Sequence, residues 1–183
     1  MIDATLTLEQ QKQAFEHRRF LAMPLAGTIA WAVIGLIGAV ASPVVAVWAV
    51  FIGSGSTVYL GMALSKFTGE DFLDKSKPKN TFDRLFFMTI VQALAVYAIA
   101  IPFFLVDYTS LPMTVGILTG LMWIPFSWLA SHWIGLFHGL ARAGLVVAAW
   151  YLFPDQRFVV IPFIIVAIYL VTIVVLEKRA RDA

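Results

Sequence analysis

The chain has 183 residues, of which 61% are hydrophobic and 13% are charged, and its mean hydropathy is +0.87. Soluble domains are about half apolar and about a quarter charged, so this composition excludes an ordinary soluble domain. Cysteine is absent, which excludes disulfides, a thiolate nucleophile and a Cys-ligated metal. The three histidines belong to no carboxylate-bearing ligand motif, so we expect no metal site and no cofactor.

Six apolar stretches follow one another along the chain, each of about 20 residues, the length that spans ~30 Å of hydrocarbon. They predict an all-α fold, a polytopic transmembrane helical bundle over residues 20–176. The predicted spans are residues 20–41, 44–65, 85–106, 112–130, 133–153 and 158–176.

The basic residues predict the orientation of these spans. Eleven of the thirteen Lys and Arg residues lie before the first span, between 66 and 84, or after the last span, and six spans put these segments on one side. The positive-inside rule then places both termini in the cytoplasm. Residues 1–19 are predicted to be a cytoplasmic amphipathic segment, and residues 177–183 a basic cytoplasmic tail. We expect this charge to set orientation, with no nucleic acid as partner.

The first segment also holds a helix-start signal. Thr7 and Gln10 have the spacing of a capping box, in which each side chain accepts a hydrogen bond from the backbone N–H of the other residue. The helix that follows mixes apolar and charged residues, which is typical of a helix lying at a membrane interface.

One cation lies inside an apolar stretch. Arg142 is near the middle of 133–153, and His138 precedes it by one helical turn. A charge in hydrocarbon costs at least a few kcal/mol, so such residues face a polar interior or serve a function. No Asp or Glu lies in any of the six apolar stretches, so Arg142 has no obvious carboxylate partner.

Polar residues of other spans are expected at the same depth as Arg142. Ser56 and Thr57 lie halfway along the second span, and Gln92 lies in the third. Together with His138 they form the predicted substrate-binding site. A guanidinium there has three possible roles: it can hold an anionic substrate in a bidentate fork, bind a lipid headgroup, or act as structural glue.

Small residues recur every fourth position in two spans, which permits close approach of helix backbones. We predict from them that spans 2 and 5 pack directly against each other and bring Arg142 beside Ser56 and Thr57. The two stripes are Gly53, Thr57 and Gly61 in span 2, and Gly135, Gly139 and Ala143 in span 5.

Two runs carry a family resemblance: GLMWIPFSWLASHWIGLFHG at residues 120–139 and WYLFPD at residues 150–155. They resemble an uncharacterised family of small multi-pass bacterial membrane proteins, a domain of unknown function. The resemblance covers about residues 70–180. It implies location in the bacterial cytoplasmic (inner) membrane, and it implies no activity.

Three functions remain open from the sequence. The first is a small transporter or channel that binds a small anionic solute at Arg142. The second is a non-catalytic membrane subunit or a lipid-binding accessory protein, with membrane lipids and their anionic headgroups as partners; a homo-oligomer also stays open. The third is an intramembrane hydrolase in which His138 activates Ser54 or Ser56, which their different depths disfavour. The residues favour a protein that is not an enzyme. A polar cavity reaching one face would indicate a transporter, and a packed, closed Arg142 an accessory protein.

Overall fold

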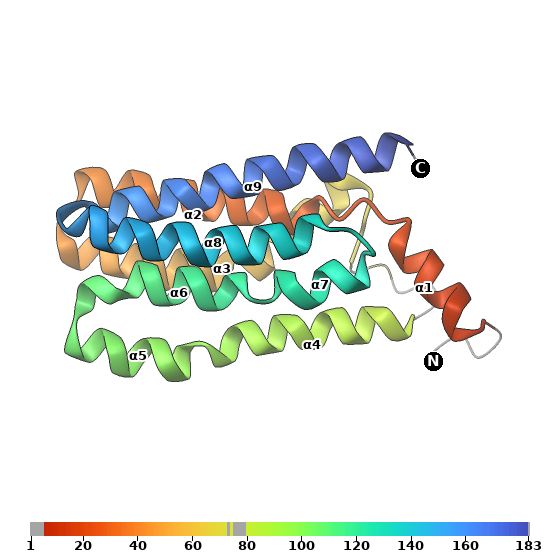
Figure 1. Cartoon of the computed structure of the whole chain (residues 1–183), viewed down its shortest axis with the longest axis horizontal. Coiled ribbons are helices and arrows are strands. Elements are labelled where there is room, and N and C mark those ends of the chain that lie inside the picture. The colour runs from red at the N-terminus through yellow and green to blue at the C-terminus, as the bar shows by residue number, and fades with distance from the viewer. Residues whose placement is uncertain (1–5, 73, 75–79, 183) are drawn as a thin grey trace.

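The computed structural model describes residues 6–72, 74 and 80–182. Figure 1 shows helices lying side by side along one long axis, with both ends of the chain at the same end of the bundle. No strand occurs among the described residues. The elements in chain order are α1 (Leu8–Glu16), α2 (Ala22–Val40), α3 (Pro43–Thr68), α4 (Thr81–Ala95), α5 (Tyr97–Val106), η1 (Tyr108–Ser110), α6 (Leu111–Gly120), α7 (Trp123–Leu129), α8 (Ile134–Leu152), η2 (Pro154–Gln156) and α9 (Arg157–Asp182).

Six helical stretches are long and apolar enough to cross a membrane, which is the number that the sequence predicts. Two of these spans contain two α-helices in series, α4 with α5 and α6 with α7. The described part of the chain is therefore all-α, and its six apolar helices indicate a multi-pass membrane protein. The six spans are Ala22–Val40, Pro43–Thr68, Thr81–Val106, Tyr108–Leu129, Ile134–Leu152 and Pro154–Arg181.

The helices extend further into the basic segments than hydropathy predicts. α3 ends at Thr68 and α4 begins at Thr81, so the connection is shorter than 66–84. The predicted basic tail, residues 177–183, is helical through Asp182 because α9 continues into it. Hydropathy falls at the first charges, whereas Glu, Lys, Arg and Ala are all strong helix formers and let the helix continue. Among the predicted basic residues of the connection, Lys75, Lys77 and Lys79 lie outside the described part of the chain.

The break between α6 and α7 follows from a proline. Pro125 has no N–H to donate to the carbonyl of Leu121, as an α-helix would require. The N–H of Ile124 bonds that carbonyl instead, at 3.1 Å, which tightens the chain at this point. The helix resumes at Trp123, whose side chain is buried in the core. The break therefore sets the direction in which the side chains of α7 point.

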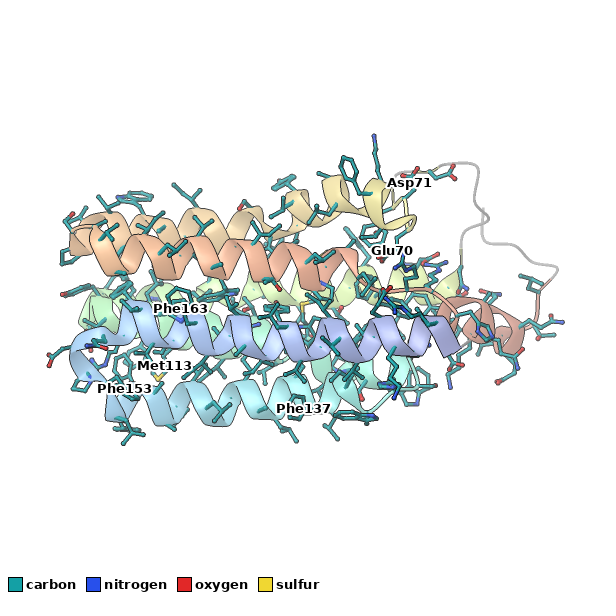
Figure 2. The ribbon with its side chains drawn as sticks, turned by 90° about the horizontal axis from the view of Figure 1, so that it is seen from above. Glu70, Asp71, Met113, Phe137, Phe153 and Phe163 are labelled. Carbon is teal, nitrogen blue, oxygen red and sulfur yellow. The ribbon has the colours of Figure 1, made fainter. Side chains whose placement is uncertain are left out.

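α2 is the central helix of the bundle. It packs along α3 on one side and α9 on the other, and α9 packs against α8. Figure 2 shows α3, α2, α9 and α8 in this order across the bundle. Glycines of α2 allow the close approach: a Cβ on Gly27 would overlap the ring of Tyr169, and one on Gly38 would overlap the carbonyl of Phe158. Phe163 lies against Gly35 in the same interface.

The predicted contact between the glycine stripes of spans 2 and 5 is wrong. Gly53 and Gly61 of α3 face side chains of α2, whereas Gly135 and Gly139 of α8 face α6 and α7. Ala143 is only partly buried. Both pairings follow from connectivity, because helices joined by a short loop usually pack against each other. The loop between α2 and α3 has two residues, so α2 occupies the small-residue face of α3.

α1 lies across the end of the bundle where the termini meet (Figure 1). Its capping box is present, with Thr7 and Gln10 in reciprocal hydrogen bonds, as the sequence predicts. Arg18 forms an ion pair with Asp83 at the start of α4. The side chain of Gln11 accepts a 3.0 Å hydrogen bond from a backbone N–H of α4. These polar contacts fasten α1 and the residues that follow it to the start of α4.

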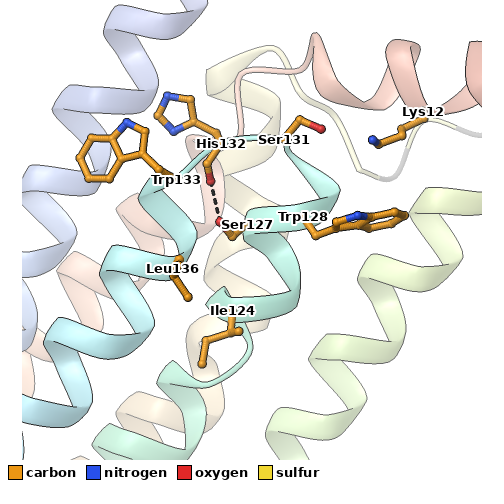
Figure 3. A pocket seen from close by; sticks show the side chains of 8 residues that line it. All are labelled: Lys12, Ile124, Ser127, Trp128, Ser131, His132, Trp133 and Leu136. Atoms are coloured by element: carbon orange, nitrogen blue, oxygen red, sulfur yellow. Dashed lines mark hydrogen bonds between the residues drawn. The ribbon is translucent and has the colours of Figure 1, made fainter.

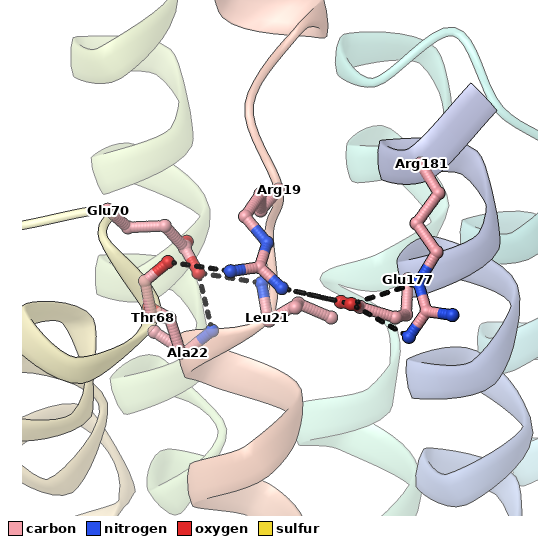
Figure 4. Close-up of polar contacts among 7 residues, drawn as sticks. All are labelled: Arg19, Leu21, Ala22, Thr68, Glu70, Glu177 and Arg181. Carbon is pink, nitrogen blue, oxygen red and sulfur yellow. Dashed lines mark hydrogen bonds and ion pairs between the residues drawn. The ribbon is translucent and has the colours of Figure 1, made fainter. Parts of the chain in front are cut away.

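A second polar cluster joins the neighbouring helix ends (Figure 4). Glu70 accepts hydrogen bonds of 2.8 Å from the N–H groups of Leu21 and Ala22, so its carboxylate caps α2. Arg19 donates to the carbonyl of Thr68 at 3.3 Å and to Glu177 of α9 at 2.8 Å. The start of α2 is thereby tied to the ends of α3 and α9.

The arrangement predicts which connections share a side of the membrane. Reporter fusions after residue 80 and after residue 182 should report the same compartment, because both positions lie at the end of the bundle that carries the termini. A fusion after Asp107, which follows α5, should report the opposite compartment. Opposite compartments for the first two fusions would contradict the six-span arrangement.

Candidate functional site

Two buried basic side chains lie one turn apart on α8. Arg142 and His138 are both 0% exposed, and they are among the largest fully buried side chains of the described chain. The sequence predicts this inward direction, because a charged group facing lipid would cost several kcal/mol more than one with polar partners. Their neighbours therefore decide what these residues do.

Arg142 contacts three other spans. Its Nη2 donates to the hydroxyl of Thr119 at 3.0 Å, and its Nη1 to the hydroxyl of Tyr169 at 3.2 Å. Its guanidinium carbon is 5.3 Å from the ring centroid of Trp31 and 5.5 Å from that of Tyr169, within the range of cation–π interactions. Gly120 leaves room for the side chain, since a Cβ there would lie 2.7 Å from Cδ of Arg142.

His138 has a similarly defined environment. Its Nδ1 is 2.8 Å from the hydroxyl of Thr172, and that hydroxyl donates to the carbonyl of Ile168 at 2.8 Å. The threonine oxygen therefore accepts from Nδ1, which carries the ring proton. Trp123 stacks on the imidazole with 4.2 Å between ring centroids, and Tyr169 meets it edge-on at 4.6 Å. Aromatic rings thus enclose both basic groups.

The charge of Arg142 has no ion-pair partner within the described residues. It is satisfied by two hydroxyl oxygens and two aromatic faces instead. Nε of Arg142 and Nε2 of His138 are buried and have no hydrogen-bond partner in this part of the chain. No group of three His, Cys, Asp or Glu side chains able to hold a metal ion occurs among the described residues. Arg142 is thus a fully buried cation that is held by two hydroxyl groups and two aromatic rings.

Three residues that we predicted beside Arg142 have other environments. Gln92 is exposed on α4. The hydroxyls of Ser56 and Thr57 donate to the carbonyl of Gly53 in their own helix, at 2.9 and 3.2 Å. Among the described residues, none of the three hydrogen-bonds Arg142. A Ser or Thr in a helix can satisfy its hydroxyl on the preceding turn, so matching depth does not require it to face a buried cation.

The serine–histidine pairing of the hydrolase hypothesis does not form in this structure. The Ser54 hydroxyl lies 2.7 Å from that of Tyr97, which ties α3 to α5. His138 lies instead within hydrogen-bond distance of Thr172 of α9, in the interior of the bundle. Within the described residues, neither Ser54 nor Ser56 hydrogen-bonds His138, and a nucleophile needs a base within about 3 Å.

Sequence reasoning missed the residues that surround the two basic groups. Tyr169 and Thr172 are the polar residues of the predicted span 158–176, and they are three apart, so they share a helix face. His138 and Arg142 show nearly the same spacing, which indicates that these two pairs of residues can face each other across α8 and α9. Trp31 and Trp123 give a weaker signal, since a mid-span aromatic residue also suits contact with lipid.

A comparison of the whole chain with known families adds a classification. The sequence model of a family of unknown function (DUF7010) matches residues 6–179. The chain belongs to this family. The resemblance inferred from residues 120–139 and 150–155 is thus confirmed, and it extends over nearly the whole chain. No curated protein and no solved structure matches the chain. The function must therefore be argued from the site.

Replacing Gly120 tests how tightly Arg142 is held. In Gly120→Ala the new Cβ would lie 2.7 Å from Cδ and 3.0 Å from Nε of Arg142. Arg142 cannot move aside freely because three other helices hold its guanidinium. We expect Gly120→Ala to destabilise the protein by about 1–3 kcal/mol, as other overpacked cores do, measured by thermal unfolding in one detergent.

Gly144→Ala is the matched control, because a Cβ at this position of α8 meets nothing within 4 Å. It should be neutral or should stabilise the helix by up to ~1 kcal/mol. Equal melting temperatures for the Gly120 and Gly144 variants would contradict the tight packing of Arg142.

Proposed function

We propose that this protein is a non-catalytic membrane accessory protein that binds anionic lipid at its basic end. The observation that carries the proposal is the closed environment of Arg142, whose side chain has no exposed surface. A cation that is fully packed, hydrogen-bonded to Thr119 and Tyr169 and covered by aromatic rings acts as structural glue. Arg142 and His138 then stabilise the fold, and the ligand binds at the surface of the protein.

A transporter or channel for a small anion at Arg142 is the competing function. It would require a water-lined route from one face to the guanidinium. Two pockets lie at opposite ends of the bundle, and neither is lined by Arg142 or His138. The geometry therefore supports the accessory role better than transport.

The lysines and arginines at one end of the bundle are the groups available for contact with anionic lipid. The end that carries the termini holds eight described Lys and Arg residues together with eight described Asp and Glu residues, whereas Arg157 is the basic residue described at the other end. Each Lys or Arg near an anionic membrane surface contributes about 1 kcal/mol of attraction. By the positive-inside rule we place this end in the cytoplasm. From the resemblance of residues 120–139 and 150–155 to small bacterial membrane proteins, we place the protein in the bacterial cytoplasmic membrane. The eight residues are Lys12, Arg18, Arg19, Lys66, Arg84, Lys178, Arg179 and Arg181.

A double-mutant cycle separates structural glue from a transport site. Arg142→Leu should cost about 1–3 kcal/mol of stability, because the buried hydroxyl of Tyr169 loses its partner. Tyr169→Phe should also destabilise, since it leaves Nη1 of Arg142 unpaired. The double variant should cost less than the sum, as measured by unfolding in detergent. An unchanged melting temperature in Arg142→Leu, together with lost anion uptake into proteoliposomes, would instead establish transport.

Lipid selectivity tests the proposed function directly. Purified protein equilibrated with equal amounts of phosphatidylglycerol and phosphatidylcholine should retain more of the anionic lipid, as measured by native mass spectrometry. Raising the salt concentration should reduce this preference, because exposed charges are screened. Equal retention of the two lipids at low salt would contradict an anionic-lipid-binding role.

A further inference from the structure

The span formed by α4 and α5 lies at the edge of the bundle and is little covered by the rest of the chain (Figure 1). Of the described residues in its most apolar stretch, 18% are buried, against 50% in the span Tyr108–Leu129 beside it. Aromatic contacts hold its inner face: the ring centroid of Phe86 lies 6.3 Å from that of Phe15 in α1 and 6.0 Å from that of Phe126 in α7. Most of the surface of α4 is therefore free to meet a partner within the membrane.

The contact between α4 and α7 at the basic end also leaves the outer face of α4 uncovered. Figure 3 shows the side chain of Trp128 pointing from α7 toward α4. Its ring lies 6.3 Å from that of Phe82 between centroids, and Trp128 remains 60% exposed. The pocket of about 490 Å³ beside it is lined by described residues of α1, α7, α8 and the α7–α8 turn, and by none of α4. The pocket and the outer face of α4 are thus separate surfaces.

One polar side chain lies on the exposed part of α4. Gln92 is seven positions after Leu85, which follows the last charged residue of this helix. At 1.5 Å per residue, Gln92 is ~10 Å inside the apolar part of the span, and a glutamine side chain is too short to reach the headgroups from there. It is exposed, and no hydrogen bond joins its amide to another described residue. Hydrocarbon offers neither donor nor acceptor, so this position favours a polar partner inside the membrane.

Gln92 belongs to a stripe that has the spacing of a helix–helix interface. Exposed residues recur at alternating intervals of three and four positions, which is the a and d pattern of a heptad. Ala95, one turn from Gln92, lets a second helix backbone approach closely. Val96 keeps a right-handed helical conformation, with φ of −60° and ψ of −27°, so the stripe continues into α5. The stripe consists of Leu85, Met88, Gln92, Ala95 and Ile99.

We propose that this stripe is the interface of a homodimer in which Gln92 pairs with Gln92 of the partner subunit. Two copies inserted in the same orientation are related by a two-fold axis along the membrane normal, so each residue of the stripe meets its equivalent at the same depth. A primary amide carries both donors and an acceptor, so the two amides satisfy each other. Lipid supplies neither group, and a different protein would need its own polar residue at this depth. The dimer goes beyond the proposed lipid-binding function and does not depend on it.

Cysteine cross-linking in membranes tests the position of the interface, because the chain has no cysteine of its own. Ala95→Cys places a thiol in the stripe and should give a disulfide-linked dimer under mild oxidation. Leu94→Cys is the matched control, since this exposed position has nearly the same depth but points ~100° away around α4. It should give little dimer. Equal cross-linking at the two positions, or no cross-linking of Ala95→Cys, would overturn the interface.

Removing the amide of Gln92 tests what holds the dimer together. Gln92→Leu should raise the dissociation constant of the dimer in lipid about 3- to 20-fold, the range of one interhelical hydrogen bond in membranes. Energy transfer between C-terminally labelled copies, measured at increasing lipid-to-protein ratios, gives this constant. Gln92→Asn keeps a primary amide and should retain most of the affinity.

A fold control distinguishes pairing from a structural role of Gln92. The melting temperature of the monomer in excess detergent should be the same in Gln92→Leu as in the unaltered protein, because no hydrogen bond to a described residue is lost. A lower melting temperature would assign Gln92 to the fold of the monomer and overturn the pairing. An unchanged dissociation constant in Gln92→Leu, or unaltered protein that stays monomeric at every lipid-to-protein ratio, would also overturn it.

Discussion

One buried cation joins four of the six spans. Arg142 of α8 reaches Trp31 of α2, Thr119 of α6 and Tyr169 of α9, without a carboxylate among the described neighbours. A desolvated cation–π contact contributes about 2 kcal/mol, and a hydrogen bond to a charged group about 1.5–3 kcal/mol. These contacts offset the cost of taking the guanidinium out of water. The same contacts make the loss of any one partner costly, because the charge would stay buried.

The basic residues also determine how α8 and α9 align. Helices in lipid gain no hydrophobic energy by association, so packing and hydrogen bonds must hold them. His138 pairs with Thr172 while Arg142 pairs with Tyr169, which is an antiparallel register of two matched contacts. A slide of one turn would break both hydrogen bonds at once. Polar groups therefore specify a register that apolar side chains alone would leave weakly defined.

Sequence reasoning reached the coarse architecture because hydropathy and charge are properties of single segments. Six spans and the inward direction of Arg142 follow from the energy of placing apolar and charged groups in hydrocarbon. The partners of Arg142 did not follow, because they depend on which helices meet. The hydroxyls of Ser56 and Thr57 donate hydrogen bonds within α3. The two-residue loop places α2 against the face of α3 that carries its small residues. The similar spacing of Tyr169 and Thr172 in α9 and of His138 and Arg142 in α8 is the feature of the sequence that indicates which helices meet at Arg142.

The closed interior and the open pocket share a structural cause in the break before Pro125. α7 has seven residues, and Trp123 and Trp128 are five apart on it, which places them about 140° apart around the helix axis. Trp123 stacks on His138 in the core, and Trp128 lines the pocket at the basic end. Had the helix continued unbroken from α6, the rotation of α7 would be set by residues 111–120 instead. Because of this break, α7 covers the buried basic site with one side chain and lines the surface pocket with another. A substitution that rotates α7 would therefore change both the buried site and the pocket.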